Sequence, residues 1–145
     1  MNDYIFKKIN GKYNFIGDFD SLYKNIDDPW GQSAKDRKEY LISRERQLRI
    51  IDGINNKKNK EEVSILDCGC GLGLTTFHLS KQFSCEGADI SSIAIQKARL
   101  AYPELTFHVL NLLSNVELTK KYDIVILNNL LWYVIDDLEN ALLNA

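Results

Sequence analysis

The chain has 145 residues, of which 45% are hydrophobic, and a formal net charge of -2 at pH 7. This length is enough for one domain with its own core, and the small negative charge gives no electrostatic case for nucleic acid or an anionic membrane as partner. No run of residues reaches the length of a membrane span, and the first residues lack the basic and then apolar pattern of a signal peptide. We therefore expect a cytoplasmic protein that binds a small molecule.

The first 31 residues are rich in aromatic residues and Asn without a regular period, which predicts short elements that cover a site. They end in Asp28-Pro29-Trp30-Gly31, a turn in which Pro fixes φ and Gly ends the turn. Apolar residues then follow a helical period from Ser33 to about Ile54. We interpret residues 1–55 as an N-terminal helical cap or lid.

The charged residues from Asn55 to Glu62 predict a surface connection to the rest of the chain, residues 56–145. Strands are predicted at about 63–67, 84–89, 105–110 and 122–127, and helices at about 73–81, 92–101 and 136–143. This alternation indicates an α/β fold: a doubly wound, Rossmann-like parallel sheet with helices on both faces. In such a fold, ligands bind at the carboxyl ends of the strands.

A glycine-rich loop follows the first of these strands. The strand ends in Asp67, and Gly69, Gly71 and Gly73 follow at intervals of two. Because glycine has no Cβ and tolerates positive φ, such a loop lets the backbone come close to a bound molecule. A second acid, Asp89, ends the next strand about 20 residues later, as expected for a carboxylate that binds a ribose. The two acids together predict a nucleoside ligand.

Spacing and charge distinguish between two kinds of nucleoside ligand. The dinucleotide fingerprint needs a third Gly at its sixth position, which here is Leu74 when counted from Gly69. Asp67 would also repel a pyrophosphate at this turn, whereas an amino group would be favourable there. S-adenosylmethionine carries a cationic amino acid end and a ribose, so it suits both acids. A nucleotide-dependent oxidoreductase is the disfavoured alternative.

These residues resemble class I S-adenosylmethionine-dependent methyltransferases over positions 63 to about 134. The run 65–73 resembles the cofactor loop, and 88–91 resembles the end of the second strand, whose acid binds the ribose. Residues 107–112 resemble the third strand, whose last residues approach the adenine, with Asn111 where the family usually has Asp. Residues 122–134 resemble the fourth strand and the turn after it. The loop chemistry and the resemblance together assign the cofactor to Asp67, Cys68, Gly69, Gly71, Gly73, Asp89, Ile90, Asn111, Leu112 and Asn128.

The run Asp28-Pro29-Trp30-Gly31, with the charged stretch after it, resembles the N-terminal region of the branch that includes nodulation-factor N-methyltransferases and other sugar-directed enzymes. This resemblance implies that Trp30 folds over the cofactor as a lid. It also implies a small-molecule acceptor of sugar type, methylated on nitrogen or oxygen. Packing of Trp30 in the core is the alternative. Aromatic side chains with a polar tip suit the walls of an acceptor pocket and equally a core; they are Tyr13, Tyr23, Trp132 and Tyr133.

The sequence assigns no catalytic base and no metal. His78 falls inside a predicted helix and His108 inside a predicted strand, where a lone histidine is more often structural. A neutral amine acceptor needs no base, whereas a hydroxyl acceptor gains from one. Three cysteines cannot all pair within one chain, and Cys68 and Cys70 are too close for a zinc Cys-x-x-Cys motif. We expect reduced thiols and no metal site.

The sheet of the resembled family continues with three more strands beyond the fourth, whereas this sequence stops at Ala145. The resemblance therefore implies a sheet truncated after the fourth strand and the helix that follows it. A fourth strand at the sheet edge invites pairing with another chain. We expect either a longer enzyme or a homodimer that shields this edge. The alternative function is a catalytically incomplete, methyltransferase-like subunit that binds the cofactor or regulates a partner.

Overall fold

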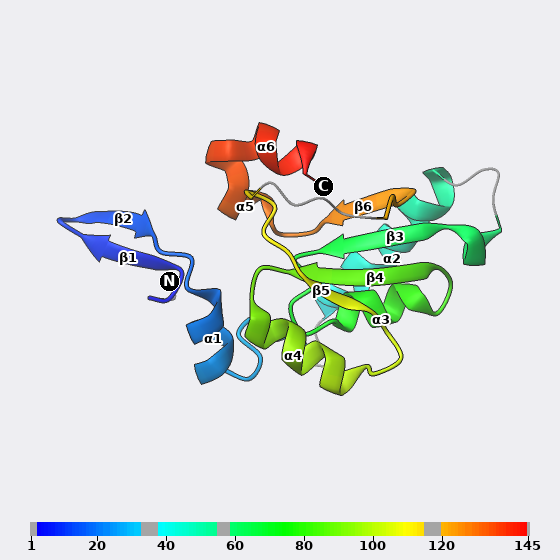
Figure 1. Ribbon diagram of the computed structural model, residues 1–145, viewed down its shortest axis with the longest axis horizontal. Coiled ribbons are helices and arrows are strands. Elements are labelled where there is room, and N and C mark those ends of the chain that lie inside the picture. The colour runs from blue at the N-terminus through cyan, green and yellow to red at the C-terminus, as the bar shows by residue number, and fades with distance from the viewer. Residues whose placement is uncertain (1–2, 33–37, 55–58, 115–119, 145) are drawn as a thin grey trace.

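The computed structural model describes residues 3–32, 38–54, 59–114 and 120–144. An N-terminal hairpin is followed by helices, and strand and helix then alternate from Ser64 to Val109 (Figure 1). In chain order they are β1 (Phe6–Ile9), β2 (Lys12–Phe15), α1 (Phe19–Asn25), α2 (Lys38–Ile54), the 3-10 helix η1 (Lys60–Glu62), β3 (Ser64–Cys68), α3 (Leu74–Ser80), β4 (Ser84–Asp89), α4 (Ser92–Ala101), β5 (Phe107–Val109), β6 (Ile124–Leu127), α5 (Leu131–Val134), the 3-10 helix η2 (Ile135–Asp137) and α6 (Leu138–Leu143).

The central sheet has four parallel strands in the order β5-β4-β3-β6. The helix α3 connects β3 to β4, and α4 connects β4 to β5, as in a doubly wound fold. The predicted α/β class and the four predicted strands are confirmed, although β5 is shorter than expected. The short helices α5 and η2 occupy a stretch between β6 and α6 where the sequence predicts a turn and the start of the last helix.

Helices cover both faces of this sheet (Figure 1). On one face, Ile65 of β3 packs with Ile51 of α2 and Leu79 of α3. On the other face, Leu66 of β3 packs with Val134 of α5. Successive side chains along a strand point to opposite faces, which explains why Ile65 and Leu66 belong to different clusters. Both are fully buried, so β3 lies at the centre of the core.

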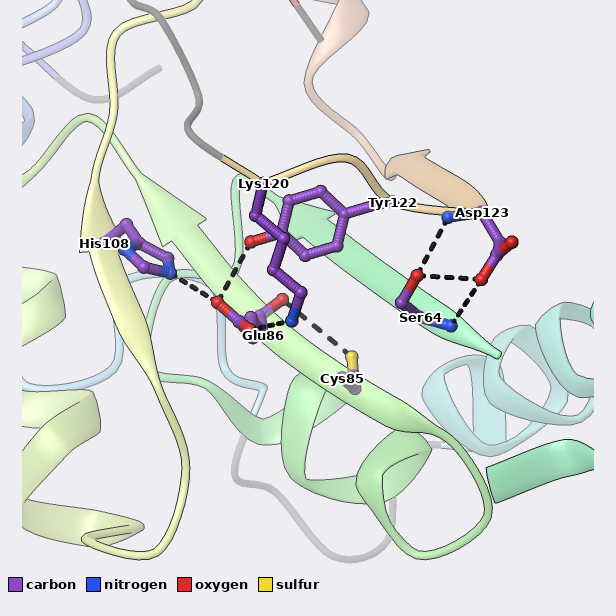
Figure 2. Close-up of polar contacts among 7 residues, drawn as sticks. All are labelled: Ser64, Cys85, Glu86, His108, Lys120, Tyr122 and Asp123. Carbon is purple, nitrogen blue, oxygen red and sulfur yellow. Dashed lines mark hydrogen bonds and ion pairs between the residues drawn. The ribbon is translucent and has the colours of Figure 1, made fainter. Parts of the chain in front are cut away.

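Polar contacts join the four strands away from their carboxyl ends (Figure 2). Asp123, just before β6, accepts hydrogen bonds from the Ser64 backbone N–H at 3.0 Å and the Ser64 hydroxyl at 2.8 Å. Glu86 of β4 accepts from three side chains, which are His108 Nε2 at 2.6 Å, the Tyr122 hydroxyl at 3.0 Å and Lys120 Nζ. Burial alone would raise the pKa of Glu86, but these donors outweigh it and hold the pKa below its usual value. The contacts fix the strands relative to one another and leave their carboxyl ends available for a site.

The N-terminal region begins with an antiparallel hairpin of β1 and β2. Its turn residues Asn10 and Gly11 have φ values of +50° and +81°, as in the two-residue turns that match the twist of a hairpin. The helix α1 then docks on the start of α4 through Asp20, which accepts hydrogen bonds from Ser91 Oγ at 2.7 Å, Ser92 Oγ at 3.0 Å and the Ile93 N–H at 3.2 Å. The sequence predicts short elements here but not a hairpin.

The strand β6 is an edge of the sheet in the described part of the chain, and its four residues are half-buried. Exposed apolar side chains follow it in α5, η2 and α6, namely Leu131, Trp132, Ile135, Leu142 and Leu143. The edge position expected for the fourth strand is therefore present. Among the helices described, none combines the length and the apolar character that crossing a bilayer requires.

Candidate functional site

A cavity of about 280 Å³ lies at the carboxyl ends of the strands. The ends of β3, β4, β5 and β6 and the loops after them line one side, while β2, α1, α2 and the turn after α1 line the other. This is where the topology of a parallel sheet places a ligand. Most residues that the sequence assigns to the cofactor or acceptor line it, namely Tyr23, Trp30, Asp67, Cys68, Gly69, Asp89, Ile90, Asn111, Leu112, Asn128 and Tyr133.

Asp67 is a buried acid near the end of β3, with only 2% of its surface exposed. Its Oδ2 accepts a hydrogen bond from Thr76 Oγ1 of α3 at 2.8 Å. Burial raises the pKa of Asp67 to about 7, against the lowering effect of the Thr76 hydrogen bonds and with a further rise from the charge of Asp89. Asp67 therefore titrates near neutral pH, and a cation beside it would lower its pKa and hold it ionised.

Asp89 ends β4 at the strand tip next to that of Asp67, because β3 and β4 are paired neighbours. Its side chain accepts hydrogen bonds from the Gly71 N–H and the Ser91 N–H, both at 2.9 Å. Burial raises the pKa of Asp89 by more than these bonds lower it. Each carboxylate oxygen has a further lone pair, so Asp89 can also accept a hydrogen bond from a ligand hydroxyl. The two predicted acids thus lie together at the cavity.

The three glycines of the loop all have positive φ, +74° at Gly69, +55° at Gly71 and +79° at Gly73. Only Gly69 lines the cavity. A Cβ on Gly73 would lie 2.7 Å from the Phe107 ring, and one on Gly71 would lie 2.6 Å from the Tyr23 hydroxyl. The sequence predicts direct approach to the ligand for all three glycines. In the structure, the missing side chains of Gly71 and Gly73 allow Tyr23 and Phe107 to pack closely against the loop.

Trp30 contributes to the cavity wall from the N-terminal region. Its Nε1 donates a hydrogen bond to the Tyr23 hydroxyl at 3.0 Å, and its ring also packs beside the buried cluster that contains Phe19 and Leu22. Trp30 therefore both lines the cavity and packs against the core, and its role as a lid stays a prediction. Burial, and then the charge of Asp89, raise the pKa of Tyr23, so its hydroxyl is neutral at physiological pH.

The far side of the cavity contains the residues expected at the adenine. Ile90 and Leu112 supply apolar surface, and Asn111 and Asn128 supply amide groups. Asn111 Oδ1 accepts a hydrogen bond from the Leu113 N–H at 3.0 Å, which leaves its side-chain N–H groups available for a ligand. This side of the cavity is therefore suited to a flat group with polar edges.

The cavity also has an aromatic wall, and its members differ in part from those predicted. Tyr133 lines the cavity, stacks on Phe15 with ring centroids 5.9 Å apart, and meets Phe19 edge-on at 5.2 Å. Phe15 and Phe19 line the cavity as well. Tyr13 and Trp132 are 59% and 79% exposed and do not line it. The aromatic lining of the cavity therefore includes Phe15 and Phe19, and it does not include Tyr13 or Trp132.

Several lining residues come from segments in which the sequence shows no motif, namely Gln32, Ser43, Arg44, Gln47 and Asn129. Ser43, Arg44 and Gln47 share one face of α2, whose polar residues the sequence would assign to solvent. The Gln32 backbone N–H donates to Asp28 Oδ1 at 2.9 Å, and the Gln32 backbone carbonyl accepts from Arg44 Nη2 at 3.4 Å. The pair Asn128-Asn129 after an apolar strand is a signal for the left-handed turn at Asn129, which has a φ of +58°.

Neither histidine lines the cavity. His108 pairs with Glu86 on the sheet, and the pKa of His78 is lowered by burial and by nearby Arg44 and Lys81. Over the described ranges, no group of three or more His, Cys, Asp and Glu side chains could hold a metal ion. The three cysteines are buried and unpaired.

A family model described as a methyltransferase domain matches residues 65–145, more than half of the chain. The chain belongs to this methyltransferase family. The chain is similar in structure to the N-methyltransferase NodS from Bradyrhizobium japonicum WM9 in complex with S-adenosyl-L-homocysteine, with 19% identity and a TM-score of 0.69 over 86% of this chain and 63% of that one. It is also similar to the sugar N-methyltransferase KedS8 from Streptoalloteichus, with 21% identity and a TM-score of 0.52 over 74% and 38%. A TehB-like S-adenosylmethionine-dependent methyltransferase from Corynebacterium glutamicum is 27% identical, with a TM-score of 0.50 over 69% and 61%.

The chain spans less than two thirds of the length of each of these solved structures. At their identities, the likeness to NodS and KedS8 shows the fold, which is the Rossmann-like fold that the sequence predicts. No curated protein matches the sequence significantly.

The family's methyl donor is S-adenosylmethionine, and the cavity of this chain fits it. Asp67 and Asp89 line the cavity, and burial disfavours their ionised forms by raising both pKa values. A cationic ligand would be favoured there because its charge would stabilise the ionised carboxylates. Gly69 presents backbone without a side chain, while Ile90 and Leu112 provide apolar walls. The sulfonium, ribose and adenine groups each have a suitable counterpart among these residues.

Proposed function

We propose that this chain carries the S-adenosylmethionine-dependent active site of a methyltransferase that acts on a small-molecule acceptor of sugar type, on nitrogen or oxygen. The observation that supports it most is the pair of buried acids at adjacent strand tips, Asp67 and Asp89, which flank a glycine loop and open into one cavity. A dinucleotide would place its pyrophosphate against these carboxylates, which disfavours an oxidoreductase.

The cofactor is held in this proposal by residues of all four strand tips. Asp67 attracts the cationic part of the ligand, and Asp89 accepts hydrogen bonds from the ribose hydroxyls. Asn111 offers its amide to the adenine edge, between the apolar surfaces of Ile90 and Leu112. The remaining contacts come from Cys68, Gly69 and Asn128, with Trp30 as a cover and Gly71 and Gly73 shaping the loop.

The aromatic wall of Phe15, Phe19 and Tyr133 positions the acceptor, because the C–H face of a sugar ring packs well on aromatic rings. S-adenosylmethionine supplies an electrophilic methyl group when it is bound. The protein's task is to hold the acceptor in line with that group, which contributes about 7–11 kcal/mol in well-oriented model reactions. Tyr23 and Tyr133 have raised pKa values and are neutral at physiological pH. An amine acceptor, which needs no base, suits this lining better than a hydroxyl.

A transfer assay tests this function. The purified protein is incubated with methyl-labelled S-adenosylmethionine and a panel of amino sugars, together with the matched sugars that carry hydroxyl groups only. We expect label on the amino sugars. Label on none of the acceptors, together with tight binding of NADH and none of S-adenosylmethionine, would contradict the proposal.

A second candidate is a cofactor-binding or regulatory subunit that pairs with another chain. It is favoured by the edge strand β6 and by the exposed apolar side chains of Trp132, Ile135 and Leu143 that follow it. In this proposal a second copy of the chain shields the edge as a homodimer. Cofactor binding without methyl transfer would support it, and a monomer by light scattering at high concentration would contradict the pairing.

In the methyltransferase proposal, residues 1–55 form the cap and residues 56–145 form the cofactor-binding core. The β1–β2 hairpin and the central sheet are separate sheets, which supports this division. The proposal also places the protein in the cytoplasm. The three buried free thiols suit a reducing compartment. Limited proteolysis and cell fractionation would check these two points.

A further inference from the structure

Gln32 has a buried hydrogen-bond acceptor without a partner. In the part of the chain that the structure describes, its Oε1 is the one buried side-chain nitrogen or oxygen with no hydrogen bond. Buried polar atoms in folded proteins are almost always paired, so such an atom indicates a donor that arrives from elsewhere. Gln32 lines the cavity, which makes a ligand the natural source of that donor.

The backbone holds this acceptor in a fixed place. The Gln32 N–H donates to Asp28 Oδ1 at 2.9 Å, and the preceding Gly31 donates to the Asp28 carbonyl at 3.1 Å. The missing side chain of Gly71 gives Oε1 its room, since a Cβ there would lie 3.3 Å from it. The acceptor is therefore pre-positioned beside the glycine loop.

Arg44 places a cation next to the same residue. Its Nη2 donates to the backbone carbonyl of Gln32 at 3.4 Å, and both residues line the cavity. A neutral acceptor beside a cationic donor matches an α-amino acid, in which an ammonium group and a carboxylate are attached to one carbon. A phosphate or a simple carboxylate would engage Arg44 alone, and a hydroxyl would engage Gln32 alone.

We propose that Gln32 and Arg44 form the subsite for the amino acid end of the ligand. Gln32 Oε1 accepts a hydrogen bond from the α-ammonium group, and the Arg44 guanidinium binds the α-carboxylate. This assignment rests on the proposed function, because S-adenosylmethionine and its product both carry that group. The N-terminal region then adds polar contacts to the amino acid end, whose cation faces Asp67, while the other strand tips recognise the nucleoside.

The test compares two ligands that share a nucleoside. S-adenosylhomocysteine has the complete amino acid, and 5′-methylthioadenosine lacks it. We expect Gln32→Leu and Arg44→Met each to weaken calorimetric binding of S-adenosylhomocysteine by about tenfold or more and to leave binding of methylthioadenosine unchanged. Retained methylthioadenosine binding also shows that the variants fold. Gln82→Leu and Arg46→Met, at exposed positions away from the cavity, are the matched controls and should bind both ligands normally.

Decarboxylated S-adenosylmethionine separates the two roles. Gln32→Leu should still weaken its binding, whereas Arg44→Met should not. The subsite would be overturned if Gln32→Leu lost affinity for S-adenosylhomocysteine and for methylthioadenosine equally. Normal binding of S-adenosylhomocysteine by both variants would also overturn it. If the folded wild type binds neither ligand, the proposed function itself fails, and that outcome is distinct from a failure of the subsite alone.

Discussion

The two sides of the cavity are built in different ways. On the strand-tip side, Asp67 and Asp89 are placed by paired strands and are 2% and 8% exposed. On the N-terminal side, Trp30 and Gln32 are placed by a turn and by hydrogen bonds to side chains. The strand tips are rigid because ladder bonds and core packing fix them, whereas the N-terminal side depends on a few polar contacts. The first side is thus the more firmly fixed of the two.

A large effect is expected at Gly71, where the two sides meet. A side chain there clashes with the Tyr23 hydroxyl and is strained at a φ of +55°. We expect Gly71→Ala to weaken S-adenosylhomocysteine binding by about tenfold or more, because the N-terminal side is pushed off the loop. Calorimetry measures this. Gly53→Ala is the control, since a Cβ there meets nothing within 4 Å and should stabilise α2 by about 0.5–1 kcal/mol. Equal behaviour of the two variants would contradict the close contact.

Asp89→Ala sharpens the comparison on the strand-tip side. The variant loses the acceptor of the Gly71 and Ser91 N–H groups as well as the proposed ribose contact. We expect the variant to bind S-adenosylhomocysteine more weakly, by about 1.5–3 kcal/mol. Calorimetric titration measures the loss, and wild-type affinity in a folded variant would show that Asp89 does not face the ligand.

Asp67 makes stability and binding respond to pH in opposite directions. Its folded pKa, about 7, lies above its ordinary value of 3.8, so its contribution to the stability of the ligand-free protein is present below the ordinary value and is lost as pH rises through about 7. A cationic ligand prefers the ionised acid, so its affinity should rise over the same range. Urea unfolding and ligand titration at several pH values, with Asp67→Asn as the reference, would detect both trends. A variant with the same pH dependence as the wild type would contradict the assignment.

A substitution of Asp20 tests how the N-terminal side is attached to α4. Asp20→Ala removes the acceptor of hydrogen bonds from Ser91, Ser92 and Ile93 at the start of α4. We expect a loss of about 1 kcal/mol in the free energy of unfolding and faster proteolysis of the N-terminal region. Asp27→Ala, which removes only an exposed ion pair with Lys97, should have no measurable effect. Similar proteolysis of both variants would count against this fastening.

The smallest effect is expected at the aromatic wall. Tyr133→Leu removes the stacking on Phe15 and should raise the KM for the acceptor by several-fold, about 0.5–1.5 kcal/mol, without changing cofactor affinity. Trp132→Leu changes an exposed ring outside the cavity and should have little effect. Steady-state kinetics with an amino sugar compares the KM values of the two variants. A larger rise in KM for Trp132→Leu would contradict the aromatic wall found in the structure and favour the one that the sequence predicts.

The strand-tip side could be predicted from the sequence because its geometry follows from local rules. An apolar run that ends in an acid, followed by glycines, defines a strand and its loop, so Asp67, Gly69 and Asp89 are found at the cavity. Asn111 and Leu112 follow in the same way from the third strand. The roles of Gly71 and Gly73 could not be predicted, because they depend on the contacts of Tyr23 and Phe107 from distant parts of the chain.

The N-terminal side was much less predictable. The Asn10-Gly11 pair is a hairpin signal that the sequence carries, and it would have placed Phe15 on a strand. By contrast, nothing in the pattern of α2 distinguishes Arg44, which lines the cavity, from the exposed Arg46. Which polar face of a helix meets a cavity is decided by tertiary packing. For the same reason Tyr13 and Trp132 were expected in the acceptor wall and lie outside it.

Calorimetric titration of the wild type, Asp67→Asn and Asp89→Ala with S-adenosylhomocysteine at neutral pH tests the account most directly. The account predicts one-to-one binding by the wild type and weaker binding by each variant, since one loses the charge that faces the cation and the other the ribose acceptor. A folded wild type that does not bind, or three proteins with equal affinity, would contradict it.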